Sequence, residues 1–347
     1  MITVFDPAQR RHAPAQELHN GSFVAHAETV ARADNMLAAV GAWRPAVDHG
    51  LAPVRRVHSS AYLDFLRTAF DDWRAAGRPG DAVPYVFPVV GRRALSLDRI
   101  DARLGAHAID CGTPIAAGTW EAAYAGAQVA LTALDHVGTG AAFALCRPPG
   151  HHAGADYCGG YCYLNNAAIA AAAAVEHGQR VAILDIDYHH GNGTQDIFYD
   201  RANPLFVSIH ADPRTDYPFY WGHADETGTG AGQGATLNLP LPHGTGVAPY
   251  RAALAVALDR VRSYAPDLLV VSFGADTFAG DPISHFALET ADYAVFAADI
   301  AALTLPTLIV MEGGYAVDAL GANVASFLGG FDAETLEISA IALSSQF

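Results

Sequence analysis

Cysteine is scarce in this chain, since only four occur among its 347 residues: Cys111, Cys146, Cys158 and Cys162. This number and spacing do not give the disulfide framework of a small secreted protein, so we expect reduced, packed thiols and a cytoplasmic protein. Cys158 and Cys162 could supply half of a structural zinc site, but such a site needs four ligands and no second matching pair occurs.

Long apolar segments are also missing. Residues 1–6 lack the basic segment followed by an apolar stretch that marks a secretory signal. The most apolar run, residues 167–175, is rich in alanine and too short to span a bilayer. We therefore expect no membrane partner.

Charge is low and unbalanced. Charged residues make up 16% and hydrophobic residues 51% of the chain, which is typical of a compact globular enzyme. The 36 acidic and 20 basic residues give a formal charge of -16, which disfavours nucleic acid and favours a cationic ligand. Solubility alone accounts for this acidity equally well.

Apolar runs alternate with helical patterns from about residue 140 onward, which is typical of β-α units and a parallel sheet. Five runs without polar alternation predict strands that are buried on both faces: 141–146, 181–186, 205–209, 268–273 and 307–311. Periodic apolar positions between them predict helices: 164–177, 249–264, 291–303 and 318–327.

The N-terminal half is less regular. The pattern predicts a strand at 2–5, helices at 26–40, 61–76 and 119–136, and a long loop at 77–117. Neither a repeat nor a low-complexity linker marks a second domain. We expect one α/β domain over residues 1–347, built as a three-layer α/β/α fold with a mainly parallel central sheet and an inserted loop near 77–117.

Four short motifs follow predicted strands: Arg-Pro-Pro-Gly-His-His at 147–152, Asp-Ile-Asp-Tyr-His-His-Gly at 185–191, Gly-Ala-Asp at 274–276 and Glu-Gly-Gly-Tyr at 312–315. Ligands of open parallel sheets bind outside the carboxyl ends of the strands, so these motifs are expected to form one site. Because side chains alternate along an extended strand, Asp185, Asp187 and His189 can point the same way.

Asp187, His189 and Asp276 make a set of three ligands of the kind expected for a catalytic divalent ion, which needs coordination positions left open for water and substrate. Asp276 taken alone could equally be a helix cap. Asp185 would overload a small metal site, so we expect it to orient a histidine instead.

His151 and His152 follow a rigid proline turn and titrate near neutrality, which suits proton transfer. Tyr315 lies in a glycine turn, from which a neutral phenol could donate a hydrogen bond to a developing oxyanion. Outside this context, a histidine pair is more often a surface or capping feature and the tyrosine an ordinary interface residue.

These residues resemble the zinc-dependent deacetylases of the arginase/deacetylase fold, most closely the bacterial acetylpolyamine amidohydrolases. The resemblance extends over nearly the whole chain. It includes His58, the Gly-Thr-Trp-Glu-Ala stretch at 118–122, the four motifs above, Gly-Gly-Tyr-Cys at 159–162 and Gly-Asn-Gly-Thr-Gln-Asp at 191–196.

The resemblance implies Zn²⁺, or alternatively Fe²⁺ or Co²⁺, on Asp187, His189 and Asp276. It makes His152 the general base and later the acid, and Tyr315 the donor to the amide oxygen. His151, held by Asp185, would give electrostatic help. Asn192 stands where one class of histone deacetylases places an aspartate behind the second histidine.

Further expectations follow from the same resemblance. Tyr161, Gly160 and Tyr217 would line a substrate tunnel. A structural K⁺ would lie near Asp185, Asp187, His189 and Ser208. A homodimer is expected, helped by the 77–117 insertion and an aromatic stretch at 216–221.

Substrate preference is less well specified than the chemistry. Polyamine-cleaving relatives carry acidic residues in the loop before Gly118, where this chain has Gly112 at one such place, Asp101 at another and Asp110 nearby. The leading hypothesis is hydrolysis of N-acetylated small cationic amines. The alternatives are deacetylation of acetyl-lysine peptides, a non-catalytic protein that keeps its metal as a staple, and a binuclear manganese hydrolase, which would need more acidic ligands.

Overall fold

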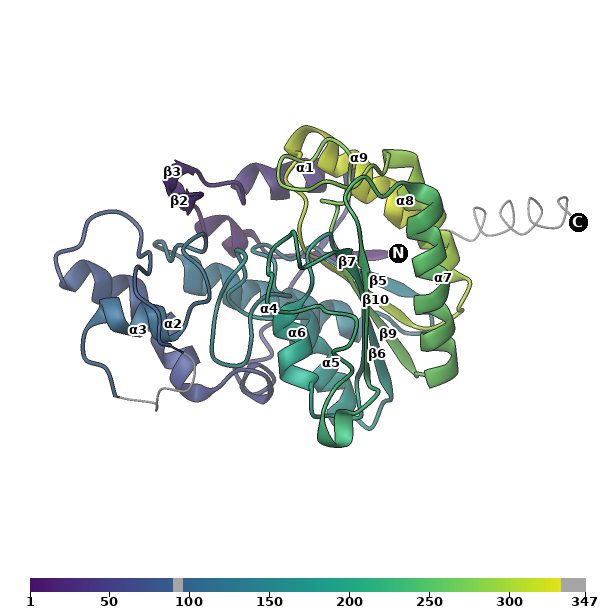
Figure 1. Ribbon diagram of the computed structural model, residues 1–347, viewed down its shortest axis with the longest axis horizontal. Coiled ribbons are helices and arrows are strands. Elements are labelled where there is room, and N and C mark those ends of the chain that lie inside the picture. The colour runs from purple at the N-terminus through teal and green to yellow at the C-terminus, as the bar shows by residue number, and fades with distance from the viewer. Residues whose placement is uncertain (90–95, 332–347) are drawn as a thin grey trace, which may run out of the picture.

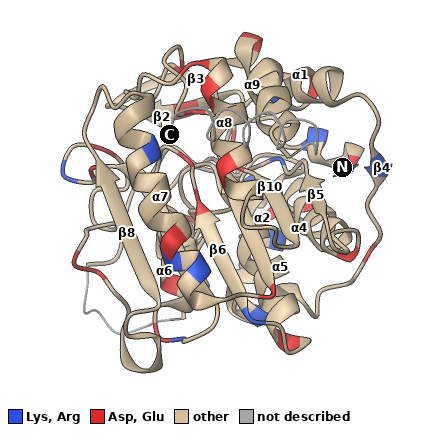
Figure 2. Ribbon diagram, turned by 90° about the vertical axis from the view of Figure 1, so that its right-hand side faces the viewer, with Lys and Arg blue, Asp and Glu red and all other residues tan. Residues whose placement is uncertain are grey.

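The computed structural model describes residues 1–89 and 96–331, and its central feature is a sheet of eight parallel strands (Figure 1). Their order across the sheet is β4-β1-β5-β10-β9-β6-β7-β8. The strands are β1 (Ile2–Phe5), β4 (Arg44–Pro45), β5 (Ala141–Ala144), β6 (Val181–Asp185), β7 (Leu205–Ala211), β8 (Thr236–Leu241), β9 (Leu268–Phe273) and β10 (Thr307–Met311). In Figure 2 the labelled strands of this sheet run across the view from β8 on the left, through β6 and β10, to β5 on the right.

Helices cover both faces of the sheet (Figure 1). One side carries α4 (Thr119–Asp135), α5 (Asn166–Glu176) and α6 (Asn192–Phe198), with α2 (Ser60–Ala75) and α3 (Ile100–Ala106) beyond them. The other side carries α1 (Val30–Val40), α7 (Val247–Tyr264), α8 (Thr290–Ala301) and α9 (Val317–Gly329).

Strand β10 shows why both layers form. Its successive side chains point to opposite faces, so Leu308 and Val310 join the hydrophobic cluster under α4 and α5. Ile309 and Met311 join the cluster under α7, α8 and α9. An uninterrupted apolar strand therefore needs helices on both faces, and the three-layer α/β/α prediction is confirmed.

Several boundaries differ from the expectations. The predicted loop at 77–117 contains α3, and the part of it at 90–95 lies outside the described residues. The helix expected from residue 26 begins only at Val30, because the backbone of Thr29 is extended and Thr29 occupies the N-cap position. Strand β8 and helix α6 were not predicted, and the sheet is parallel throughout.

A small antiparallel hairpin of β2 (Gln16–His19) and β3 (Ser22–Ala25) lies outside the main sheet. All four cysteines are free thiols, as expected. Among the residues that the structure describes, none of the helices combines the length and apolar character that a bilayer crossing requires.

Strand order and register place the motifs together. Strands β10, β9 and β6 are direct neighbours, and Asp185 at the end of β6 is paired with Ser272 of β9 and Ser208 of β7. Because parallel strands end at the same edge of the sheet, the segments that follow β6, β9 and β10 converge there.

Candidate metal centre and active-site pocket

Asp187, His189 and Asp276 lie at this edge with their ligand atoms within 4.8 Å of one another. His189 Nδ1 is 3.0 Å from Asp276 Oδ2 and 3.4 Å from Asp187 Oδ1. Both aspartates are fully buried, whereas the His189 side chain remains 11% exposed. The three groups therefore form a compact cluster with one side open.

Backbone donors fix both carboxylates. The N–H of Gly313 donates to Asp187 Oδ2 at 2.8 Å, and the N–H of Tyr188 donates to Asp276 Oδ1 at 2.9 Å. Burial raises the pKa of Asp276 to about 7, and the negative charge of Asp187 adds to this effect. Burial also acts to raise the pKa of Asp187, but His151 and His189 outweigh it and lower that pKa.

This donor set fits a divalent metal ion. Two buried carboxylates that disfavour each other's charge are stabilised when a cation lies between them. Glycines leave room for the cluster, because a Cβ on Gly274 would come within 2.0 Å of Asp187 Oδ2 and one on Gly313 within 2.4 Å of Asp276 Oδ2. Two carboxylates and one imidazole also match the open three-ligand arrangement of catalytic ions.

The two adjacent histidines have different partners. His151 Nδ1 lies 3.0 Å from Asp185 Oδ2, and His152 Nδ1 lies 2.6 Å from Asn192 Oδ1. Asn192 also donates from Nδ2 to the Tyr157 hydroxyl at 3.2 Å, which directs its oxygen toward His152. His152 Nδ1 therefore carries the hydrogen and its Nε2 is free to accept a proton.

Opposite pKa shifts follow from these surroundings. Burial acts to lower the pKa of His151, but the carboxylates of Asp185 and Asp187 raise it to about 10. Burial lowers the pKa of His152 well below its ordinary value, and the imidazoles of His151 and His189 lower it further. At neutral pH the pair therefore consists of a charged and a neutral imidazole.

Tyr315 is held from several directions. Its backbone N–H donates to Asp281 Oδ2 at 2.6 Å, and the guanidinium carbon of Arg32 lies 4.9 Å from its ring centre. Arg32 also donates to the carbonyls of Glu312 and Gly314, at 2.6 Å each. Burial raises the pKa of the Tyr315 phenol well above its ordinary value, so the phenol stays protonated.

A cavity of about 520 Å³ opens above these groups. Its floor includes His152, His189 and Tyr315, and its walls include Gly160, Tyr161 and Tyr217. The Tyr161 ring packs edge-on against that of Tyr315 at 5.4 Å, and the Tyr217 ring against that of His152 at 5.0 Å. Gly160 must lack a side chain, since a Cβ would come within 2.1 Å of His152.

Two acidic residues of the cavity wall were not assigned from the sequence. Asp110 accepts hydrogen bonds at Oδ2 from the Gly160 N–H at 2.7 Å and the Tyr217 hydroxyl at 2.8 Å. Glu17, from the hairpin, accepts from the Tyr161 hydroxyl at 2.9 Å. Asp101 instead binds Arg78 and Arg99, and it does not line the cavity.

The structure thus brings together the residues that the motifs nominated. Ser208 lies beside Asp185 in the sheet register, but its hydroxyl is 2.8 Å from His210 Nδ1. Reasoning from motifs missed Glu17, Asp110, Arg32 and Asp281. Arg32 and Glu17 precede every strand motif in the chain, so no local pattern connects them with the site.

A parallel α/β sheet with a carboxylate-imidazole-carboxylate cluster beneath a cavity is the arrangement expected of a metal-dependent hydrolase. The histone deacetylase domain family matches residues 22–331. Acetylpolyamine amidohydrolase 1 of Pseudomonas aeruginosa is 51% identical over 344 residues, covering 96% of this chain and 99% of the relative. The Mycoplana ramosa acetylpolyamine amidohydrolase is 44% identical over 339 residues, covering 95% and 99%.

Solved structures agree with this similarity. The crystal structure of the acetylpolyamine aminohydrolase from Burkholderia pseudomallei superposes with a TM-score of 0.92 at 43% identity, covering 96% of this chain and 99% of that one. The chain therefore belongs to the histone deacetylase family and is an enzyme of the deacetylase type. This confirms the resemblance seen in the sequence, and the family implies a divalent metal.

We predict that Gly274→Ala lowers the affinity for a divalent metal by about 10- to 100-fold, because the new methyl group displaces the Asp187 carboxylate. Metal content after dialysis against a graded series of zinc buffers measures the effect. Gly140→Ala is the matched control, since a Cβ there meets nothing within 4 Å. Equal zinc retention by the two variants would contradict the proposed ligand set.

Proposed function

We propose that this chain hydrolyses the amide bond of N-acetylated small cationic amines, with acetylpolyamines as the leading substrate class, and releases acetate and the free amine. The observation that carries the proposal is the convergence of the metal cluster, a neutral His152 and a protonated Tyr315 on the floor of one acidic cavity. The names of the relatives that match nearly the whole chain support the same substrate class.

Asp187, His189 and Asp276 would hold the metal, for which we propose Zn²⁺, with Fe²⁺ or Co²⁺ as alternatives. When bound, such an ion supplies a Lewis acid that polarises the amide carbonyl. The remaining steps belong to side chains of this protein.

We assign the proton transfers to His152. Its Nε2 is unprotonated at neutral pH and its side chain lines the cavity, so it can accept the proton of the attacking water. The same nitrogen then returns the proton to the leaving amine. Asn192 is a positioning residue here, because it fixes the ring and the tautomer through Nδ1.

His151 acts through its charge. Its hydrogen bond to Asp185 keeps it protonated, and its ring centre lies 4.1 Å from that of His152. A fixed positive charge at this distance disfavours a second protonation, so His152 stays available as a base.

Tyr315 donates its phenolic hydrogen to the amide oxygen as negative charge develops on it. Arg32 and Asp281 hold the phenol and its backbone before substrate arrives, so little reorganisation accompanies the reaction.

The amine end of the substrate would meet Asp110 and Glu17. Asp110 Oδ1 is buried and, within the described part of the chain, has no hydrogen-bond partner. Because Asp110 lines the cavity, an ammonium group bound there would oppose the negative charge of this carboxylate. This favours a cationic amine over a neutral amide substrate.

The direct test compares substrates on zinc-loaded protein. We expect kcat/KM for acetylated putrescine, cadaverine or spermidine to exceed that for an acetyl-lysine peptide by at least about tenfold. Tyr315→Phe should lower kcat by about 10²- to 10³-fold, while Tyr220→Phe, at an 82% exposed position, should not. Preference for the peptide would favour the acetyl-lysine alternative. Unchanged ligand affinity and turnover in Tyr315→Phe would favour a non-catalytic metal-binding protein.

The role of Asn192 predicts a pH effect. Asn192→Asp places a negative charge beside His152 Nδ1 and raises the pKa of His152. Because His152 is a base only when neutral, the acidic limb of the kcat/KM profile should move to higher pH by about one to three units. Asn192→Ala, which adds no charge, should lower kcat without that upward shift. An acidic limb that stays in place in Asn192→Asp would contradict the assignment.

We also propose a structural K⁺ near Asp185, Asp187, His189 and Ser208, since buried carboxylates at the end of β6 carry excess negative charge.

We further propose a homodimer. The apolar side chains of Tyr85, Val86, Phe87 and Val89 in the 77–117 segment are exposed, which supports an interface there. Analytical ultracentrifugation at micromolar concentration should give a dimer mass, and a monomer mass would contradict this expectation.

A further inference from the structure

A second group of potential ligands lies at the rim of the cavity. Asp216 follows β7, His243 follows β8, and His285 lies in the loop after β9. One ligand atom of each lies within 4.8 Å of the others. Asp216 and His285 line the same cavity as the catalytic residues, whereas His243 is not among the residues that line it.

The rim carboxylate is already oriented. Asp216 Oδ1 accepts a hydrogen bond from the Tyr188 hydroxyl at 2.6 Å, and Oδ2 lies 2.5 Å from His243 Nε2. Burial acts to raise the pKa of Asp216, but its bonds from Tyr188, Thr215 and His243 outweigh burial and lower that pKa. Asp216 is therefore a carboxylate whose orientation is fixed from two sides.

The two histidines remain accessible. Their ring centres are 4.4 Å apart, and both residues are exposed. The His285 ring packs against the His243 ring at a tilt of 45°. Imidazole nitrogen favours Zn²⁺ and similar transition metals over Mg²⁺ or Ca²⁺. Two imidazoles and one carboxylate complete a three-ligand site for such an ion.

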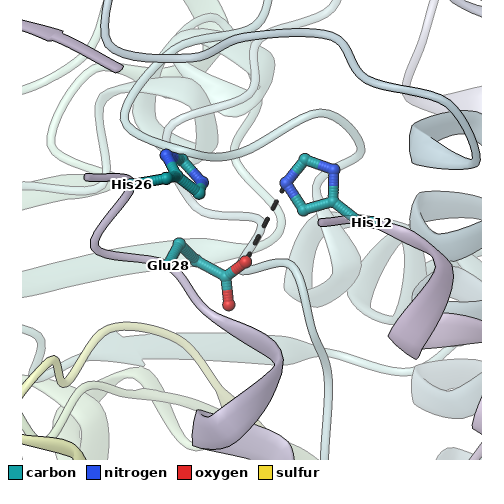
Figure 3. A group of neighbouring side chains, drawn as sticks. All are labelled: His12, His26 and Glu28. Atoms are coloured by element: carbon teal, nitrogen blue, oxygen red, sulfur yellow. Dashed lines mark ion pairs between the residues drawn. The ribbon is translucent and has the colours of Figure 1, made fainter. Parts of the chain in front are cut away.

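The buried group of His12, His26 and Glu28 is a weaker candidate (Figure 3). Glu28 Oε1 already lies 2.7 Å from Arg32 and 2.9 Å from Arg147. A divalent cation there would lie beside two buried guanidinium charges, and the nearby carboxylate of Glu17 already lies 2.9 Å from His26 Nδ1. Electrostatics therefore favour the rim group.

We propose that Asp216, His243 and His285 form a second, peripheral site for a divalent transition metal such as Zn²⁺, and that its occupation inhibits the enzyme. A cation at the rim narrows the mouth of the cavity and repels a positively charged amine. This inhibitory effect, but not metal binding itself, rests on the proposed function.

Direct metal binding tests the site independently of activity. Equilibrium dialysis against rising free Zn²⁺ should give two zinc equivalents for the wild type and one for His243→Ala and for His285→Ala. His19→Ala removes an exposed histidine of the same cavity outside the group and should keep two. Asp187→Ala should lose the catalytic equivalent and keep the rim equivalent. A wild type that saturates at one equivalent, or rim variants that retain two, would overturn the proposal.

Kinetics test the consequence. Excess Zn²⁺ should raise the apparent KM for an acetylated amine without lowering kcat, and His243→Ala should weaken this inhibition by at least about tenfold. With one zinc per chain, His243→Ala should have normal activity because His243 lies outside the cavity. Equal inhibition of wild type and variant would reject the inhibitory role. A lack of activity in all proteins would instead count against the proposed function and leave the dialysis result standing.

Discussion

Four buried carboxylates at one edge of the sheet are the constraint on which the site depends. Asp185, Asp187, Asp276 and Glu312 are fully buried and lie at or just beyond the ends of β6, β9 and β10. Charges of one sign are expensive in such an environment unless partners oppose them. A charged His151, backbone N–H donors and a divalent cation would each offset part of the cost of burying these negative charges.

Glu312 shows how neighbouring groups stabilise one of these buried carboxylates. Its Oε2 accepts hydrogen bonds from the backbone N–H groups of Gly150 and His151, at 2.7 and 3.1 Å. The same carboxylate that follows β10 therefore fixes the turn that presents both histidines. Burial raises its pKa to about 7, with Asp185 and Asp187 contributing and His151 opposing. The positions of the buried carboxylates and of the two adjacent histidines thus depend on one electrostatic network.

The sequence predicted what depends on local pattern. Strands 268–273 and 307–311 were placed at their observed ends because a short, continuous apolar run bounded by polar motifs is typical of a buried strand. The convergence of the motifs followed from the rule that parallel strands end at one edge. The pairing of Asn192 with His152 was expected from the resemblance, and the structure places the two in contact.

Other features depend on contacts that no local pattern reveals. Helix α3 is seven residues long and lies within a segment rich in turn-forming residues, so its periodicity is too brief to detect. Arg32 reaches carbonyls about 280 positions further along the chain. Asp110 differs from Asp101 only through tertiary placement, since one carboxylate meets the cavity and the other meets two arginines.

Tyr188 connects the two candidate metal sites. It lies between the proposed ligands Asp187 and His189, its backbone N–H donates to Asp276, and its hydroxyl donates to Asp216. Because Tyr188 is fully buried and packs edge-on against Phe286 at 4.7 Å, it has little freedom to follow one site without the other. The strand end that orders the proposed catalytic ligands therefore also sets the position of the rim carboxylate.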